Sequence, residues 1–262
     1  MDAFGGAYQN HVSPHTVNSS TAQGMDDKDF MVFAKVNDNS DSAQFSVCPR
    51  RDTPPPVMRI IAKNLRGLKT EERLHELLLE TETTGDDWDI LILSETWRAD
   101  GFEMFSTNEG HLFANAGCDE QRRGVGFLIH RRWVKHVKAF QPINERVAFI
   151  TIQKRKLKMR IIGVYFPHTG YPDEPVQTMY DVLTNLVFES RSKKEQVIIG
   201  GDFNAEIGAR SELDNQNYIG SWSIGQQNYR GFWLKRWCEL EGLSVANTFY
   251  PKIDENIVTY AR

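Results

Sequence analysis

The sequence has few cysteines, and they lie far apart. Its 262 residues include only Cys48, Cys118 and Cys238. An odd number of distant cysteines excludes a disulfide framework and a cysteine-rich zinc site. We therefore expect three reduced thiols that are mostly buried, as free cysteines commonly are.

Long apolar runs and a strong net charge are also missing. No segment reaches the ~18 apolar residues of a membrane span, and the N-terminus lacks the charged-then-apolar pattern of a signal peptide. We expect a soluble, intracellular protein with no membrane partner. The net charge of −4 gives no general attraction to nucleic acid. A polyanionic partner must therefore meet a local basic patch or a metal ion.

The composition that is present is globular, but the first 56 residues differ from the rest. Hydrophobic residues make up 40% of the chain, enough for a sizeable core. Residues 1–56 are polar, lack apolar periodicity and end in the stiff spacer "CPRRDTPPP". Only "DFMVFAKV" (29–36) is apolar, which indicates a short strand or a docking segment. We expect 1–56 to be a disordered polar leader, dispensable for the fold, and 57–262 to be the domain.

From Val57 onward, apolar runs of strand length alternate with segments of helical periodicity. The pattern predicts strands at 57–65, 88–97, 124–140, 145–167, 196–204 and from 244, with a hairpin turn at "KRKLK" (154–158). It predicts helices at 70–82, 173–190 and 229–241, the last ended by Gly242. Strands joined both by hairpins and by helical crossovers indicate a mixed α/β sandwich.

Three of the predicted strands end in polar side chains. Asn64 follows one strand, Glu95 a second, and Asp202 with Asn204 a third. Each could be a turn or cap residue, but the carboxyl ends of sheet strands are where binding sites collect. Two carboxylates and two amides suit a hard cation such as Mg²⁺. We expect the glycines at 200–201 to form a sharp corner beside them.

Five segments follow one another in a specific order: "AKNLRGL", "ILILSETW", "GVGFLIH", "IIGVYFPH" and "VIIGGDFNAEIG". In this order they resemble the endonuclease/exonuclease/phosphatase superfamily over residues 57–262, most closely its retrotransposon-endonuclease and craniofacial-development-protein-like branch. The resemblance implies a four-layer α/β sandwich of two mixed β-sheets flanked by helices. It also implies a Mg²⁺-dependent phosphodiester hydrolase, with Mn²⁺ as a substitute, and favours a DNA endonuclease of retroelement origin.

The resemblance also implies a role for each matching residue. Glu95 is the expected principal metal ligand, and Asn64 contacts the metal-bound water or a phosphate. Tyr165 reaches the scissile phosphate, Asp202 orients or deprotonates the attacking water, and Asn204 holds that water or a phosphate oxygen. Each role fits the chemistry, since a carboxylate can be a metal ligand or a base, and an amide or phenol can donate to developing negative charge.

Loop residues supply candidate contacts to substrate. Arg122 and Arg123, in "GCDEQRRGVG", are candidate phosphate contacts, and Trp222 and Asn228 lie in a loop after Asp202. A packing role for Trp222 is an equal alternative. The basic turn "KRKLK" could grip a nucleic-acid backbone or could be a solvated hairpin.

The sequence departs from the family pattern at three places. Lys63 replaces an aromatic residue, and His168 replaces an Asn after the tyrosine motif. The closing Ile-Asp-Tyr and Ser-Asp-His motifs do not occur after "NTFYPKIDENIVTYAR". We therefore expect the last strands to be missing, turnover to be low, and the exposed sheet edge to favour association with another chain. A catalytically impaired remnant and a phosphatase of the same superfamily are the alternatives.

Overall fold

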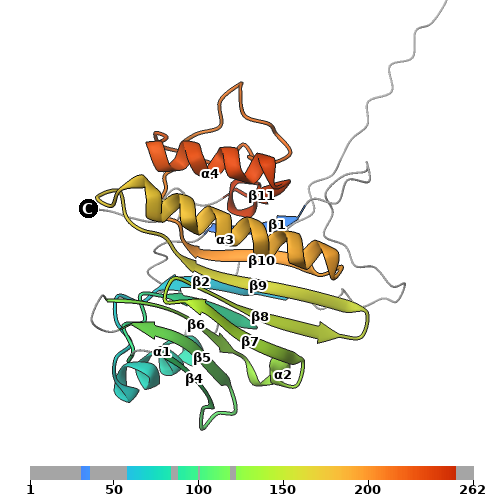
Figure 1. The fold of residues 1–262 in the computed structure, drawn as a ribbon. Coiled ribbons are helices and arrows are strands. Elements are labelled where there is room, and N and C mark those ends of the chain that lie inside the picture. Colours follow the sequence, from blue (N-terminus) through green and yellow to red (C-terminus); the bar gives the residue numbers. More distant parts are fainter. Residues whose placement is uncertain (1–30, 36–57, 84–87, 100, 119–121, 252–262) are drawn as a thin grey trace, which may run out of the picture.

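The chain folds as a sandwich of two mixed β-sheets flanked by helices, which confirms the expected α/β class (Figure 1). The computed structural model describes the backbone of residues 31–35, and residues 58–83, 88–99, 101–118 and 122–251 in full. Cys48 lies outside these residues, while Cys238 is buried and Cys118 is half-buried, both as free thiols. No helix of the described residues is long and apolar enough to cross a membrane.

The smaller sheet has five strands in the order β2-β3-β6-β5-β4. Their bounds are Ile60–Asn64 (β2), Ile90–Ser94 (β3), Gly101–Ser106 (β4), Leu112–Cys118 (β5) and Arg123–Ile129 (β6). Helix α1 (Glu71–Thr83) connects the parallel pair β2 and β3, as a crossover must. Its Leu74, Leu77 and Leu78 pack on the outer face of this sheet.

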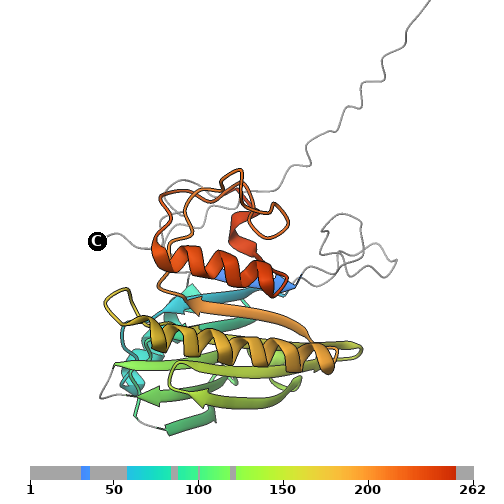
Figure 2. The ribbon, with the colours of Figure 1, turned by 45° about the horizontal axis from the view of Figure 1, so that its top comes forward.

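The larger sheet has six strands in the order β11-β1-β10-β9-β8-β7. Their bounds are Met31–Lys35 (β1), Val137–Asn144 (β7), Val147–Lys154 (β8), Leu157–Tyr165 (β9), Gln196–Asp202 (β10) and Leu243–Val245 (β11). The remaining elements are α2 (Arg131–Val134), α3 (Asp173–Ser192), α4 (Tyr229–Leu240) and the 3-10 turn η1 (Ala246–Thr248). Helices α3 and α4 cover the outer face of this sheet (Figures 1 and 2).

Alternation along β9 shows how the two sheets meet. Met159 and Ile161 point toward the five-stranded sheet, whereas Ile162 and Val164 pack under α3. A Cβ atom at Gly163 would lie 2.7 Å from Val125 Cγ1, so the sheets approach closely at this glycine. The same alternation leaves Tyr165 on the face between the sheets.

Strand β1 falls in the apolar stretch 29–36, for which the sequence indicates a short strand or a docking segment. Residues 31–35 pair antiparallel with β10 on one side and with β11 on the other. This stretch therefore belongs to the six-stranded sheet, because two neighbouring strands offer it hydrogen-bonding edges that a local pattern does not reveal. The other residues of the expected leader lie outside the described residues.

The double glycine also differs from the expected sharp corner. Gly200 and Gly201 lie inside β10, and the left-handed turn comes later, at Asn204 with φ of 48°. Gly201 has φ of 134°, and a Cβ atom there would lie 2.0 Å from the Val164 carbonyl oxygen. Glycine is needed because β10 runs so close to β9.

Candidate active site

Four strands end at the same edge of the sandwich, and their last residues form two pairs in register. Asn64 of β2 lies beside Ser94 of β3, and Asp202 of β10 lies beside Tyr165 of β9. Neighbours in register point to the same face of a sheet, here the face between the two sheets. The polar cluster, as we call Asn64, Ser94, Glu95, Tyr165 and Asp202, therefore combines side chains from both sheets.

Asn64 joins the two carboxylates of this cluster. Its Nδ2 donates to Glu95 Oε1 at 2.8 Å and to Asp202 Oδ2 at 3.1 Å. Asn64, Glu95 and Asp202 are all only partly buried, so a ligand has access to them. One amide therefore links Glu95 and Asp202, which follow two different strands.

Glu95 is held in an unfavourable backbone conformation. Its φ of 53° lies in the left-handed region, which costs a residue other than glycine about 1–2 kcal/mol. Trp97 and Asn204 have similar φ values of 52° and 48°. Strained residues of this kind gather at functional sites, where the surrounding structure fixes them. The strain around Glu95 therefore supports a functional role for this edge of the sandwich.

Asp202 and Asn204 form a small turn of their own. The Asn204 backbone N–H donates to Asp202 Oδ1 at 2.8 Å, and Asn204 Nδ2 donates to the Phe166 carbonyl oxygen at 2.8 Å. These bonds fix the Asp202 carboxylate and the loop that follows β10. Asn204 lies next to the polar cluster with its amide nitrogen bound to the backbone, and its role in the site stays a prediction.

The cluster carries surplus negative charge. Burial raises the pKa of Asp202, the charge of Glu95 raises it further, and hydrogen bonds from Asn204 and Asn64 oppose the rise. The pKa of Tyr165 is also raised, first by burial and then by the charges of Glu95 and Asp202. Its phenol therefore stays protonated at neutral pH and acts as a hydrogen-bond donor.

Arg146, which the sequence analysis did not single out, lies beside Tyr165. It is buried, its Nη1 donates to the Tyr165 carbonyl oxygen at 3.1 Å, and its guanidinium lies 5.2 Å from the Tyr165 ring. The Tyr171 ring lies 5.6 Å away on the same guanidinium. The sequence signal was a lone Arg at the start of an apolar strand, which reveals nothing until its aromatic neighbours are known.

The two predicted phosphate contacts of the 122–123 turn lie near this group. Arg123 Nη1 pairs with Glu145 at 2.6 Å, and its hydrogen bond to the Tyr171 phenol is the largest cause that lowers the pKa of Tyr171. Arg122 is exposed, and its guanidinium lies 5.4 Å from the Trp97 ring. Arg122 therefore lies beside Trp97, two residues after Glu95, and Arg123 lies beside Tyr171, which also contacts Arg146.

Trp222 and Asn228 are placed differently. Trp222 is 47% exposed, and its backbone N–H donates to the Thr248 carbonyl oxygen at 2.9 Å. Asn228 caps α4, because its Oδ1 accepts from the backbone N–H of Gly231 at 2.7 Å and of Glu206 at 3.2 Å. The helix cap accounts for Asn228 without a ligand, and substrate contact by either residue stays a prediction.

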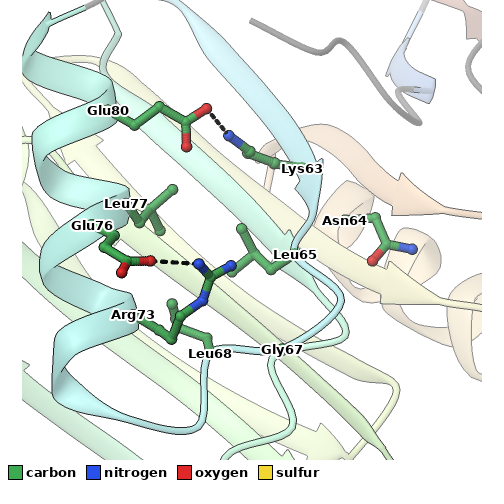
Figure 3. Close-up of a pocket in the computed structure, with 9 residues that line it drawn as sticks. All are labelled: Lys63, Asn64, Leu65, Gly67, Leu68, Arg73, Glu76, Leu77 and Glu80. Carbon is green, nitrogen blue, oxygen red and sulfur yellow. Dashed lines mark hydrogen bonds and ion pairs between the residues drawn. The ribbon is translucent and has the colours of Figure 1, made fainter.

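Lys63 and His168 do not join the polar cluster. Lys63 points to the opposite face of β2, where it pairs with Glu80 at the rim of a cavity of about 160 Å³ between β2 and α1 (Figure 3). Figure 3 shows Asn64 turned away from the α1 residues that line this cavity. His168 is exposed, and its Nδ1 accepts from the Gly170 backbone N–H at 3.1 Å. Both departures from the family pattern therefore serve local structure.

The donor set of the polar cluster fits a hard divalent cation. Within the described parts of the chain, no group of three or more His, Cys, Asp or Glu side chains is placed to hold a metal. Mg²⁺ needs fewer, since it is commonly bound by one or two carboxylates and completes its shell with water and phosphate oxygens. Ser94 Oγ is buried without a hydrogen-bond partner. This hydroxyl, which the sequence analysis missed, adds a free oxygen beside the carboxylates.

Comparisons with known proteins find similar sequences and similar solved structures. Craniofacial development protein 2 from Bos taurus is 25% identical over 174 residues, which is 66% of this chain and 28% of the relative. The chain thus spans less than a third of that relative's length.

Two solved structures resemble this chain at low identity. The endonuclease domain of TRAS1, a telomere-specific non-LTR retrotransposon, matches with 18% identity and a TM-score of 0.43, over 71% of each chain. The AP endonuclease LMAP from Leishmania major matches with 12% identity and a TM-score of 0.47, over 71% of this chain and 66% of that one.

A family model matches residues 61–249, a range that contains every member of the polar cluster. This match covers well over half of the chain. The chain belongs to the Endonuclease/Exonuclease/phosphatase family.

Proposed function

We propose that the polar cluster hydrolyses phosphodiester bonds of DNA with Mg²⁺, as an endonuclease of retroelement origin. The observation that carries the proposal is the double hydrogen bond from Asn64, which holds Glu95 and Asp202 together across the two sheets. The order of the five sequence segments supports the retroelement origin.

Glu95 and Asn64 are the groups that would hold the metal ion, with the free Ser94 hydroxyl beside them. A bound Mg²⁺ supplies charge stabilisation to a phosphoryl oxygen. Mn²⁺, which also prefers oxygen ligands, serves as a substitute. Asn64 is neutral, so it can bridge the carboxylates without adding to the charge that the cation must compensate.

Asp202 is the base in this proposal. As a water oxygen forms its bond to phosphorus, a proton of that water passes to the Asp202 carboxylate, and the bond from phosphorus to the leaving oxygen breaks. The raised pKa of Asp202 makes it a stronger acceptor than an exposed Asp. The leaving oxygen takes its proton from solvent, and Asp202 returns its own proton to solvent.

Tyr165 stabilises the phosphoryl group as a donor. Its phenol is protonated and lies against Glu95 and Asp202, so it can donate to an oxygen on which negative charge develops. Arg146, Arg122 and Arg123 supply positive charge at the same edge of the sandwich. They provide the local basic patch that an acidic chain needs to meet a polyanion.

Nicking of supercoiled plasmid by the full chain tests the proposal. We expect nicking that requires Mg²⁺ or Mn²⁺, stops with EDTA, and is lost in Glu95→Gln and Asp202→Asn. A slow rate of nicking would still support the proposal if Glu95→Gln abolishes it. Equal rates for the chain and Glu95→Gln would contradict the proposal and favour a remnant without catalysis. Release of phosphate from phosphomonoesters, with intact plasmid, would favour a phosphatase instead.

A further inference from the structure

Positive charge is concentrated in residues 131–160. This segment contains ten Lys and Arg residues and one acidic residue, Glu145, although the whole chain has a net charge of −4. Some of these cations have internal partners: Arg132 pairs with Asp89, and the buried Arg160 pairs with Glu195 and Glu189. Arg146 lies at the polar cluster. Most of the others have no role in the site described above.

The fold brings six of these cations to one end of the sandwich. The backbone N–H of Gln153 donates to the His136 carbonyl oxygen at 2.9 Å, which places the β8–β9 turn beside α2 and the start of β7. Lys154 Nζ lies 4.3 Å from the Trp133 ring. We call this group the basic end; its members are Arg131, Lys135, Lys138, Lys154, Arg155 and Lys156.

The electrostatics of His136 agree with a shared surface for Lys135, Lys138 and Lys154. The pKa of His136 is lowered, first by burial and then by the positive charges of Lys154, Lys135 and Lys138. In the described part of the chain, no carboxylate pairs with any member of the basic end. All members except Lys154 are exposed. Their charge is therefore unneutralised and available to a ligand.

The β8–β9 turn keeps a cation where backbone geometry favours glycine. Lys154 and Leu157 close a two-residue hairpin turn, and its first residue, Arg155, has φ of 55°. Glycine commonly takes such a position, because a left-handed residue with a side chain costs about 1–2 kcal/mol. Local stability therefore does not account for Arg155, whereas a use for its charge does.

The basic end lies far from the polar cluster. Strand β9 starts at Leu157, beside this turn, and finishes at Tyr165. Nine residues at ~3.3 Å each separate the two by roughly 25–30 Å. Figure 1 shows α2 and the β8–β9 turn away from the end of the sandwich where β9 finishes. At ~3.4 Å per base pair, a duplex must extend roughly eight base pairs beyond the polar cluster to reach the basic end.

We propose that the basic end is a second nucleic-acid-binding surface, which holds the sugar-phosphate backbone of a DNA or RNA segment outside the active site. Six unpaired cations suit phosphate contacts, which give affinity without reading sequence. A protein partner would require an apolar centre in its interface, and no large hydrophobic side chain that is exposed in the described residues belongs to α2 or to the β8–β9 turn. The inference is independent of the proposed function, because its test reads binding and not cleavage.

Fluorescence anisotropy with a labelled 30-base-pair DNA and a single-stranded RNA tests this surface. All variants carry Glu95→Gln and are measured in EDTA. The triple variant Lys135→Gln, Arg155→Gln, Lys156→Gln is compared with Lys193→Gln, Lys194→Gln, Arg236→Gln, which removes the same charge from exposed positions elsewhere. We expect the first variant to weaken binding about tenfold or more and to reduce the salt dependence by about 0.9 per lost contact for duplex, or 0.7 for single strand.

A second variant separates binding from folding. Arg155→Gly should raise the Tm, because it relieves the left-handed residue, and should still weaken binding. Comparison of the two probes shows whether DNA or RNA is the preferred source of the backbone. Equal effects of the two triple variants, or none from either, would overturn the proposal. Tighter binding to polyglutamate or to phosphatidylserine vesicles than to both nucleic acids would overturn it as well.

Discussion

The amide nitrogen of Asn64 lies 3.1 Å from a carboxylate oxygen of Asp202, although the two residues belong to different sheets. This single bond ties the end of β2 to the end of β10. It also brings Glu95, the second acceptor of the same amide, within reach of Asp202. The arrangement sets two negative charges beside one neutral donor.

Replacing Asp202 with Asn should stabilise the metal-free protein at neutral pH. The pKa of Asp202 is raised by burial and by Glu95, so its charged form opposes folding. The penalty is complete above the folded pKa and disappears as pH falls toward the ordinary value of 3.8. We expect a gain on the order of 1 kcal/mol, or about 2–4 °C in Tm. Thermal unfolding in EDTA from pH 4 to 8 measures it.

Asp214→Asn is the control with the opposite sign. Burial raises the pKa of Asp214, but the hydrogen bond from Lys235 and others outweigh it, so the net shift is downward. Its charged form therefore stabilises the fold above pH 3.8, and this contribution is lost as pH falls through the lowered pKa. Asp214→Asn should lower the Tm at neutral pH. A loss of stability in both variants would contradict the charge balance proposed for Asp202.

Removing the Tyr165 hydroxyl should slow hydrolysis without unfolding the protein. Loss of one preorganised donor typically costs about 10²–10³ in kcat, and Tyr165→Phe keeps the ring that contacts Arg146. The pKa of Tyr165 is raised above its ordinary value of 10.0, so the wild-type rate should show no loss from phenol ionisation up to that pH. Nicking rates of the wild type and of Tyr165→Phe, measured from neutral pH up to the ordinary phenol pKa of 10.0, test both effects. Tyr180→Phe, in the core under α4, should leave the rate unchanged, and an equal fall in both variants would argue against a donor role.

Deleting residues 1–56 should lower the Tm by several degrees. The deletion removes β1, so β10 and β11 lose the strand that pairs with both. A shorter deletion of residues 1–30 keeps β1 and serves as the control. Differential scanning calorimetry compares the two, and each 1 kcal/mol corresponds to about 2–4 °C for a domain of this size. Equal Tm values for both deletions would show that β1 adds nothing to stability.

Gly201→Ala should destabilise the protein much more than Gly225→Ala. Both glycines have positive φ values, 134° and 83°, so both substitutions strain the backbone. Only at Gly201 would the new Cβ atom meet another atom closely, at 2.0 Å from the Val164 carbonyl oxygen. We expect about 1 kcal/mol for Gly225→Ala and at least 3 kcal/mol for Gly201→Ala. Urea unfolding measures both, and similar values would show that β10 can move away from β9.

The sequence pattern reveals most of the sheet strands and the edge where the polar cluster forms. Asn64, Glu95 and Asp202 could be located because each lies within a few residues of the end of a short apolar run, and the carboxyl ends of such strands meet. Gly242, with φ of 59°, ends α4 as the pattern predicts. The roles of these residues in catalysis stay predictions.

Other features could not be read from local patterns. Strand β4 exposes Phe102 and Met104, and β5 contains the small residues Ala114 and Ala116, so neither shows clear alternation. The four-residue helix α2 is shorter than the helical period can reveal. Arg146 has meaning only through two tyrosines that follow it by many positions.

The position of β1 has a consequence for the order of folding. The strand emerges from the ribosome before every other described element, yet of the described strands its partners β10 and β11 come last. Contacts between distant parts of a chain form slowly, because loop-closure entropy opposes them. We therefore expect the six-stranded sheet to close late, with β1 unpaired during translation until β10 and β11 have been synthesised.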